Sequence, residues 1–84
     1  MEKKKIKRSQ TGFRMESNML KVLKGLAEYL DITLGDLMEG VVLHAFEGKT
    51  PFSEETLERI HMLKQIYGLE LSADDSHKLV EQND

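Results

Sequence analysis

Basic side chains are concentrated at the start of this 84-residue chain. Residues 1–14 contain six Lys and Arg and a single acidic residue, Glu2, which gives them a net charge of +5. Crowding like charges together does not favour folding, so the segment is either a solvated tail or a surface for a negatively charged partner. Clustered Lys and Arg are typical of proteins that bind the phosphates of nucleic acid.

The rest of the chain is acidic. Residues 15–52 carry a net charge of −3, residues 53–84 carry −5, and the whole chain carries −3. Charge asymmetry of this kind indicates a nucleic-acid-binding arm joined to an acidic body.

The sequence lacks the residue combinations of an enzyme. It contains no Cys, which excludes disulfides and thiolate metal sites. His44, His61 and His77 lack metal-ligand spacing, and there is no Ser/His/Asp set, no pair of catalytic carboxylates in an apolar setting and no Gly-rich phosphate loop. We therefore expect a protein that is not an enzyme and has no cofactor or metal.

Length and hydropathy set further bounds. No apolar run approaches the roughly 18 residues of a membrane span, and no hydrophobic stretch follows the basic start as in a signal peptide. We therefore expect a cytoplasmic protein without membrane contact. A chain this short buries a marginal core, and with disulfides excluded, oligomerisation is the expected remedy.

A period-two pattern runs from Arg8 to Met15. Thr11, Phe13 and Met15 fall on one side of it, which predicts a short, half-buried β-strand, although Gly12 weakens the pattern. A single strand needs a partner for its backbone donors and acceptors. Because the chain shows no second convincing strand, we expect this strand to pair with the same strand of a second copy.

Apolar residues at three- and four-residue steps predict helices in the rest of the chain. The first spans about 14 residues with Ser17 as its cap and ends at Asp31 and Ile32. The second begins at Thr33, which together with Asp36 has the spacing of a capping box, and it ends before Gly48.

A third helix is predicted over residues 54–67. Ser53 caps its start, and Gly68 ends it. One last short helix is predicted from about Ala73, with Ser72 and Asp75 as a capping box.

The order of basic strand, helix, short break and helix resembles the ribbon-helix-helix family of bacterial transcription factors. The segments that carry the resemblance are FRM, ESNMLKVLKGLAEYLDI and ITLGDLMEGVVLHAF, and they cover Arg8 to about Glu47. The resemblance implies a mostly α fold in which one N-terminal strand pairs across a homodimer and two core helices follow. The expected division is a flexible basic arm at 1–7, a dimerisation and DNA-binding domain at 8–48 and an acidic helical extension, with a third helix, at 49–84.

The family implies a transcriptional repressor that reads the major groove of double-stranded DNA with an antiparallel β-ribbon. By resemblance, Gln10, Gly12 and Arg14 occupy the outward positions of the strand. Arg14 suits guanine and Gln10 suits adenine, whereas Gly12 offers no side chain. The full set of expected DNA contacts is Lys5, Lys7, Arg8, Gln10, Gly12, Arg14, Thr33, Leu34 and Gly35.

The family also implies that two chains share one core. The residues expected in this dimer core are Phe13, Met15, Leu23, Leu26, Leu37, Met38, Val41, Val42 and Phe46. Dimers could assemble further on DNA.

Two alternative functions stay open. In the first, the protein is an antitoxin of the same fold, whose residues 53–84 bind a toxin as a protein partner. In the second, it is a protein-interaction module that has lost DNA binding, which Gly12 and the acidic body favour.

Overall fold

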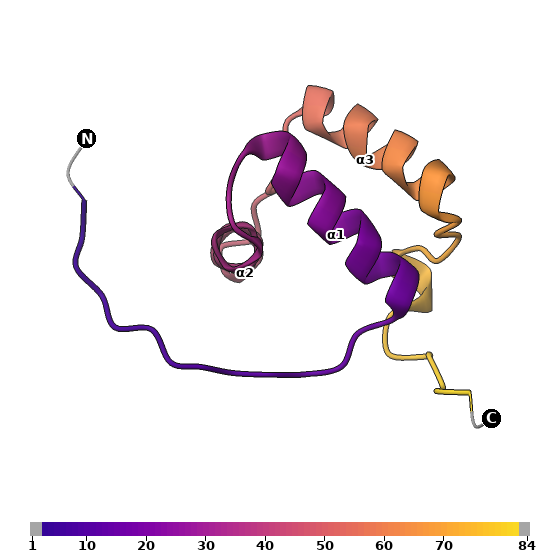
Figure 1. The fold of residues 1–84 in the computed structure, drawn as a ribbon, viewed down its shortest axis with the longest axis horizontal. Helices are drawn as coiled ribbons and strands as arrows, with labels where there is room; N and C mark the ends of the chain where they lie inside the picture. Colours follow the sequence, from indigo (N-terminus) through magenta and orange to yellow (C-terminus); the bar gives the residue numbers. More distant parts are fainter. Residues whose placement is uncertain (1–2, 83–84) are drawn as a thin grey trace.

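The computed structural model describes residues 3–82. Its elements are α1 (Ser17–Leu30), α2 (Leu34–Phe46), α3 (Glu54–Tyr67) and a single 3₁₀ turn, η1 (Ala73–Asp75). Helices α1 and α3 lie side by side, and α2, seen end-on in Figure 1, lies against the other side of α1 at a steep angle to it. Residues 1 and 2 of the predicted arm lie outside the described residues.

Polar caps fix where the helices begin. The hydroxyl of Thr33 accepts a hydrogen bond from the amide of Asp36 at 3.0 Å, and Ser53 accepts one from Thr56 at 3.2 Å. These caps satisfy amide groups that have no partner within the helix, as the sequence predicted. The capping box that begins at Ser72 is also formed, and it starts η1.

The start of α1 differs from the prediction. The carboxylate of Glu16, not the hydroxyl of Ser17, accepts the hydrogen bond from the amide of Met19, at 2.7 Å. Ser17 is the first residue of the helix itself. A negative group at this position also interacts favourably with the helix dipole.

The core lies where the three helices meet. Leu26 is 1% exposed, and Ala27 and Leu37 are also buried. The side chains that pack around these three come from all three helices and from the turn before α3: Leu23, Leu30, Leu34, Val41, Phe52, Ile60 and Leu63. The acidic extension predicted at 49–84 therefore contributes Phe52, Ile60 and Leu63 to the same core as α1.

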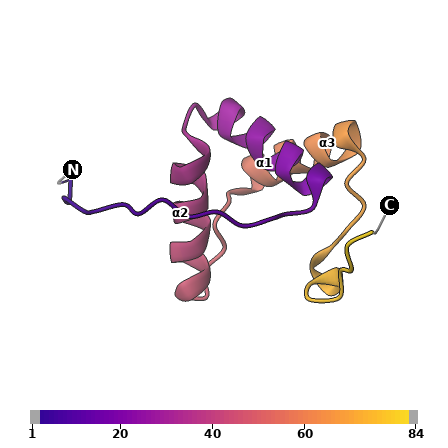
Figure 2. The same ribbon diagram turned by 60° about the horizontal axis from the view of Figure 1, so that its bottom comes forward.

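The predicted ribbon-helix-helix fold is wrong. Among residues 3–82 there is no β-strand, and residues 3–15 form no backbone-to-backbone hydrogen bond. The segment instead leaves α1 as an extended chain that passes across α2 (Figure 2). The alternation of side chains was real, but no neighbouring strand in the chain pairs with this segment, and period-two alternation alone does not make a strand. The coarser expectation of a mostly α chain agrees with the three helices.

Within residues 3–82, no helix has the length and apolar character needed to span a membrane.

Candidate nucleic-acid-binding segment

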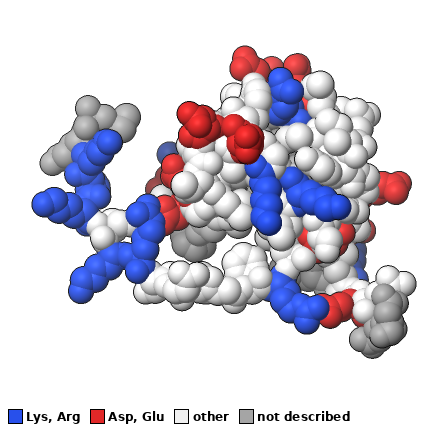
Figure 3. All heavy atoms as spheres, viewed as in Figure 1, with Lys and Arg blue, Asp and Glu red and all other residues white. Residues whose placement is uncertain are grey.

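Residues 3–14, which we call the basic segment, lie on the outside of the molecule. Every residue in it is exposed. Figure 3 shows its Lys and Arg side chains projecting from a chain that stands off the helical body. Lys3, Lys4, Lys5 and Lys7 form no ion pair with any residue in the described part of the chain. Four cations are therefore free to meet a negatively charged partner.

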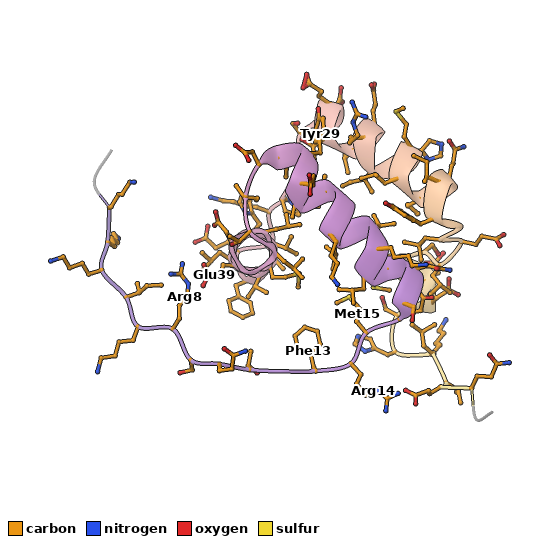
Figure 4. All side chains as sticks on the ribbon, viewed as in Figure 1. Arg8, Phe13, Arg14, Met15, Tyr29 and Glu39 are labelled. Carbon is orange, nitrogen blue, oxygen red and sulfur yellow. The ribbon has the colours of Figure 1, made fainter. Side chains whose placement is uncertain are left out.

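Arg8 is held against α2. Its Nε donates to Oε2 of Glu39 at 2.8 Å, and its Nη2 donates to Oε1 at 2.9 Å, so that both carboxylate oxygens are used (Figure 4). Hydrogen bonding from Arg8 lowers the pKa of Glu39, and the same bond raises the pKa of Arg8. Asp36, in the first turn of α2, also raises the pKa of Arg8, which places this arginine beside the start of the helix.

Arg14 is held by the other end of the chain. Its Nη2 donates to Oε2 of Glu81 at 2.7 Å, across 67 residues of sequence. Both side chains remain mostly exposed. The basic segment is thus attached to the body near each of its two arginines.

Gln10 and Gly12 lie between these two attachments. Both are exposed, and the side chain of Gln10 has no hydrogen-bond partner among the described residues. Because no strand pairs with the segment, no ribbon fixes the direction in which Gln10 and Arg14 point. The expected contacts of Gln10 and Arg14 with base edges stay predictions.

The start of α2 contains the three remaining DNA contacts expected from the sequence. The hydroxyl of Thr33 is occupied by the cap, and Leu34 packs against the core. Gly35 is exposed, with open space around it. Thr33 and Gly35 are therefore both exposed at the start of α2, and the exposed carboxylate of Asp36 directly follows Gly35.

The residues expected in a dimer core fall into three groups. Leu23, Leu26, Leu37 and Val41 pack in the core of their own chain. Met15 and Met38 are half-buried. Phe13, Val42 and Phe46 are 70%, 38% and 82% exposed.

Two of the exposed members, Val42 and Phe46, lie next to a residue on α2 that the sequence analysis missed. Leu43, in the C-terminal half of α2, is 64% exposed. Together with Val42 and Phe46 it forms what we call the α2 patch. A signal was present, since the apolar stripe of this helix is broader than one facing helix requires.

Helix α3 packs against α1. The guanidinium of Arg59 lies 4.3 Å from the ring centre of Tyr29, a cation–π contact between the two helices. Ile60 and Leu63 pack against the core beside it. Leu57, Met62 and Ile66 of α3 are exposed, and Leu57 and Ile66 lie on opposite sides of the helix.

Within the described part of the chain, no group of three or more His, Asp or Glu is placed to hold an ion.

The chain was compared with known families, curated proteins and solved structures. No family model matches it, and neither a curated protein nor a solved structure shows significant similarity to it.

Proposed function

We propose that this protein binds double-stranded DNA as a homodimer through its basic segment and acts in transcription regulation. The observation that carries the proposal is the set of four lysines, from Lys3 to Lys7, that are exposed and form no ion pair among the described residues. Residues 15–84 of the chain carry a net negative charge, so the basic segment is the part that suits a polyanion.

The chemistry of the segment favours contacts with phosphates. Lysine is a flexible point charge with three donors and no acceptor, which matches phosphate oxygens wherever they lie along the duplex. Such contacts release counterions from DNA and supply affinity that does not depend on base sequence. The extended backbone of residues 3–14 can follow a DNA backbone without first unfolding from a helix.

The α2 patch supports the homodimer. Val42, Leu43 and Phe46 lie on a part of α2 that extends away from α1 and α3 in Figure 2. A small monomer rarely exposes adjacent large apolar side chains without a partner for them. A second copy of α2 would bury the patch and add to a core that is marginal in a chain of 84 residues.

The proposal is tested by measuring binding to a short fluorescent duplex at low salt. In one variant Lys3, Lys4, Lys5 and Lys7 are all replaced with Ala. In the control variant Lys21, Lys24, Lys49 and Lys78, which lie on the body, are replaced with Ala, so that the net charge is the same.

The basic-segment variant should bind at least tenfold more weakly than the control. The reason is that it loses several phosphate contacts, which together supply much of the affinity for DNA at low salt. Equal affinities of the two variants, or no binding by the unaltered chain, would contradict the proposal.

A further inference from the structure

The lysines and the arginines of the basic segment differ in whether they form ion pairs with the rest of the chain. Within the described residues its four lysines have no ion-pair partner, whereas both of its arginines are paired. The two acceptors come from distant elements, Glu39 from α2 and Glu81 from the segment after η1. Two chain-distant carboxylates thus meet the only two guanidinium groups of the segment.

The geometry of the first pair matches the way in which arginine binds phosphate. Arg8 donates through Nε and Nη2 to the two oxygens of Glu39 at 2.8 and 2.9 Å. This two-point arrangement is the one by which guanidinium groups recognise both carboxylates and phosphates. A phosphate that binds Arg8 in the same way must first displace Glu39.

The rest of the segment would not resist such a displacement. Residues 3–15 form no backbone-to-backbone hydrogen bond, and the ring of Phe13 is 70% exposed between the two attachments. Both ion pairs are also exposed, and exposed pairs are weak enough to be exchanged for a competing anion.

We infer that Glu39 and Glu81 act as internal competitors of DNA, each holding one arginine of the basic segment until a phosphate replaces it. The inference rests on the proposed function. In this arrangement the unpaired lysines make the first contact with the duplex, and Arg8 and Arg14 transfer to phosphates afterwards. Each transfer separates a carboxylate from its arginine, so the chain's own acidic residues lower its affinity for DNA.

The test uses three single substitutions that remove the same charge. Glu39→Gln and Glu81→Gln each remove a competitor, and Glu58→Gln removes an exposed carboxylate of α3 that has no ion-pair partner among the described residues. We expect the first two to bind a random-sequence duplex about two- to fivefold more tightly than the control, which is the range that an exposed ion pair supports.

A double-mutant cycle separates competition from simple loss of negative charge. If Glu39 acts through Arg8, the gain from Glu39→Gln should disappear in a chain that already contains Arg8→Gln. If the gain persists there, or if Glu58→Gln tightens binding equally, the inference is overturned.

A second readout needs no DNA. Trypsin cleaves after Arg8, and release from Glu39 should make cleavage at this bond severalfold faster in Glu39→Gln than in Glu58→Gln. Equal rates in the two variants would overturn the inference whatever their DNA affinities.

If neither the unaltered chain nor Glu39→Gln binds the duplex, the proposed function is overturned together with the inference. Duplex binding that is equal in Glu39→Gln and Glu58→Gln overturns the inference alone.

Discussion

Leu63 of α3 packs against the backbone of α1 at Gly25. A Cβ atom added to Gly25 would lie 3.1 Å from Cδ2 of Leu63, closer than ordinary van der Waals contact. Tyr67, one turn further along α3, would lie 3.6 Å from the same atom. The two helices can approach this closely because residue 25 has no side chain.

Two of the glycines within helices, Gly25 and Gly40, should therefore respond differently to replacement with Ala. Gly40, in α2, has open space around it, so Gly40→Ala should raise the free energy of unfolding by about 0.8–1 kcal/mol through helix propensity alone. Gly25→Ala has the same advantage in helix propensity, but Leu63 must move to make room for the new methyl group. The free energy of unfolding should therefore rise by less than in Gly40→Ala, or fall. Urea unfolding of both variants measures the difference, and equal gains would show that α3 does not pack closely at Gly25.

Two apolar residues on α3 should differ in how much their truncation to Ala destabilises the protein. Leu63 packs against the core, whereas Ile66 is 69% exposed. Leu63→Ala should lower the free energy of unfolding by about 2 kcal/mol, near the lower end for such truncations because the side chain is only partly buried. Ile66→Ala should change it by less than about 0.5 kcal/mol. If chemical unfolding gives the same value for both, α3 is not part of the core.

The α2 patch should determine the oligomeric state. Phe46→Asp places a charge in the proposed contact between copies, and Ile66→Asp places one on another exposed position, on α3, as the control. Sedimentation equilibrium at micromolar concentration should give twice the chain mass for the unaltered protein and for Ile66→Asp, and a lower mass for Phe46→Asp. A Phe46→Asp variant that still sediments as a dimer would exclude this face as the interface.

The pair between Arg8 and Glu39 should depend on pH. Because hydrogen bonding from Arg8 lowers the pKa of Glu39, the pair is complete at neutral pH and is lost as the pH falls through that lowered pKa. Arg8→Gln should raise the pKa of Glu39 toward its ordinary value. The carboxyl carbon of Glu39, followed by NMR from neutral to acidic pH, reports the shift, and an unchanged midpoint would mean that the pair does not form in solution.

Local signals in the sequence were sufficient to predict most of the helices. Thr33 and Ser53 cap the helices that they were expected to cap, and Gly68 ends α3 in the left-handed conformation that favours glycine. These features depend on residues within a few positions of one another. The start of α1 was misplaced because Ser17 and Glu16 are adjacent and either side chain can reach the first turn.

Long-range features could not be predicted in this way. The strand at 8–15 was inferred from alternation alone, but a strand forms only when another strand pairs with it, and alternation does not supply that partner. The attachments of Arg8 to Glu39 and of Arg14 to Glu81 span 31 and 67 residues, and exposed ion pairs leave no periodic pattern in a sequence. The expected DNA contacts at Arg8 and Arg14 were therefore named without the carboxylates that hold them.

The salt dependence of duplex binding tests the DNA-binding proposal most directly. The logarithm of the binding constant should fall linearly with the logarithm of salt concentration, with a slope of about 0.9 for each phosphate contact. Replacing Lys3, Lys4, Lys5 and Lys7 with Ala should make this slope shallower by about 0.9 for every contact that a homodimer loses. The same number of lysine replacements on the body should leave the slope unchanged. A slope that is equal in the two variants would contradict the role of the basic segment in binding DNA.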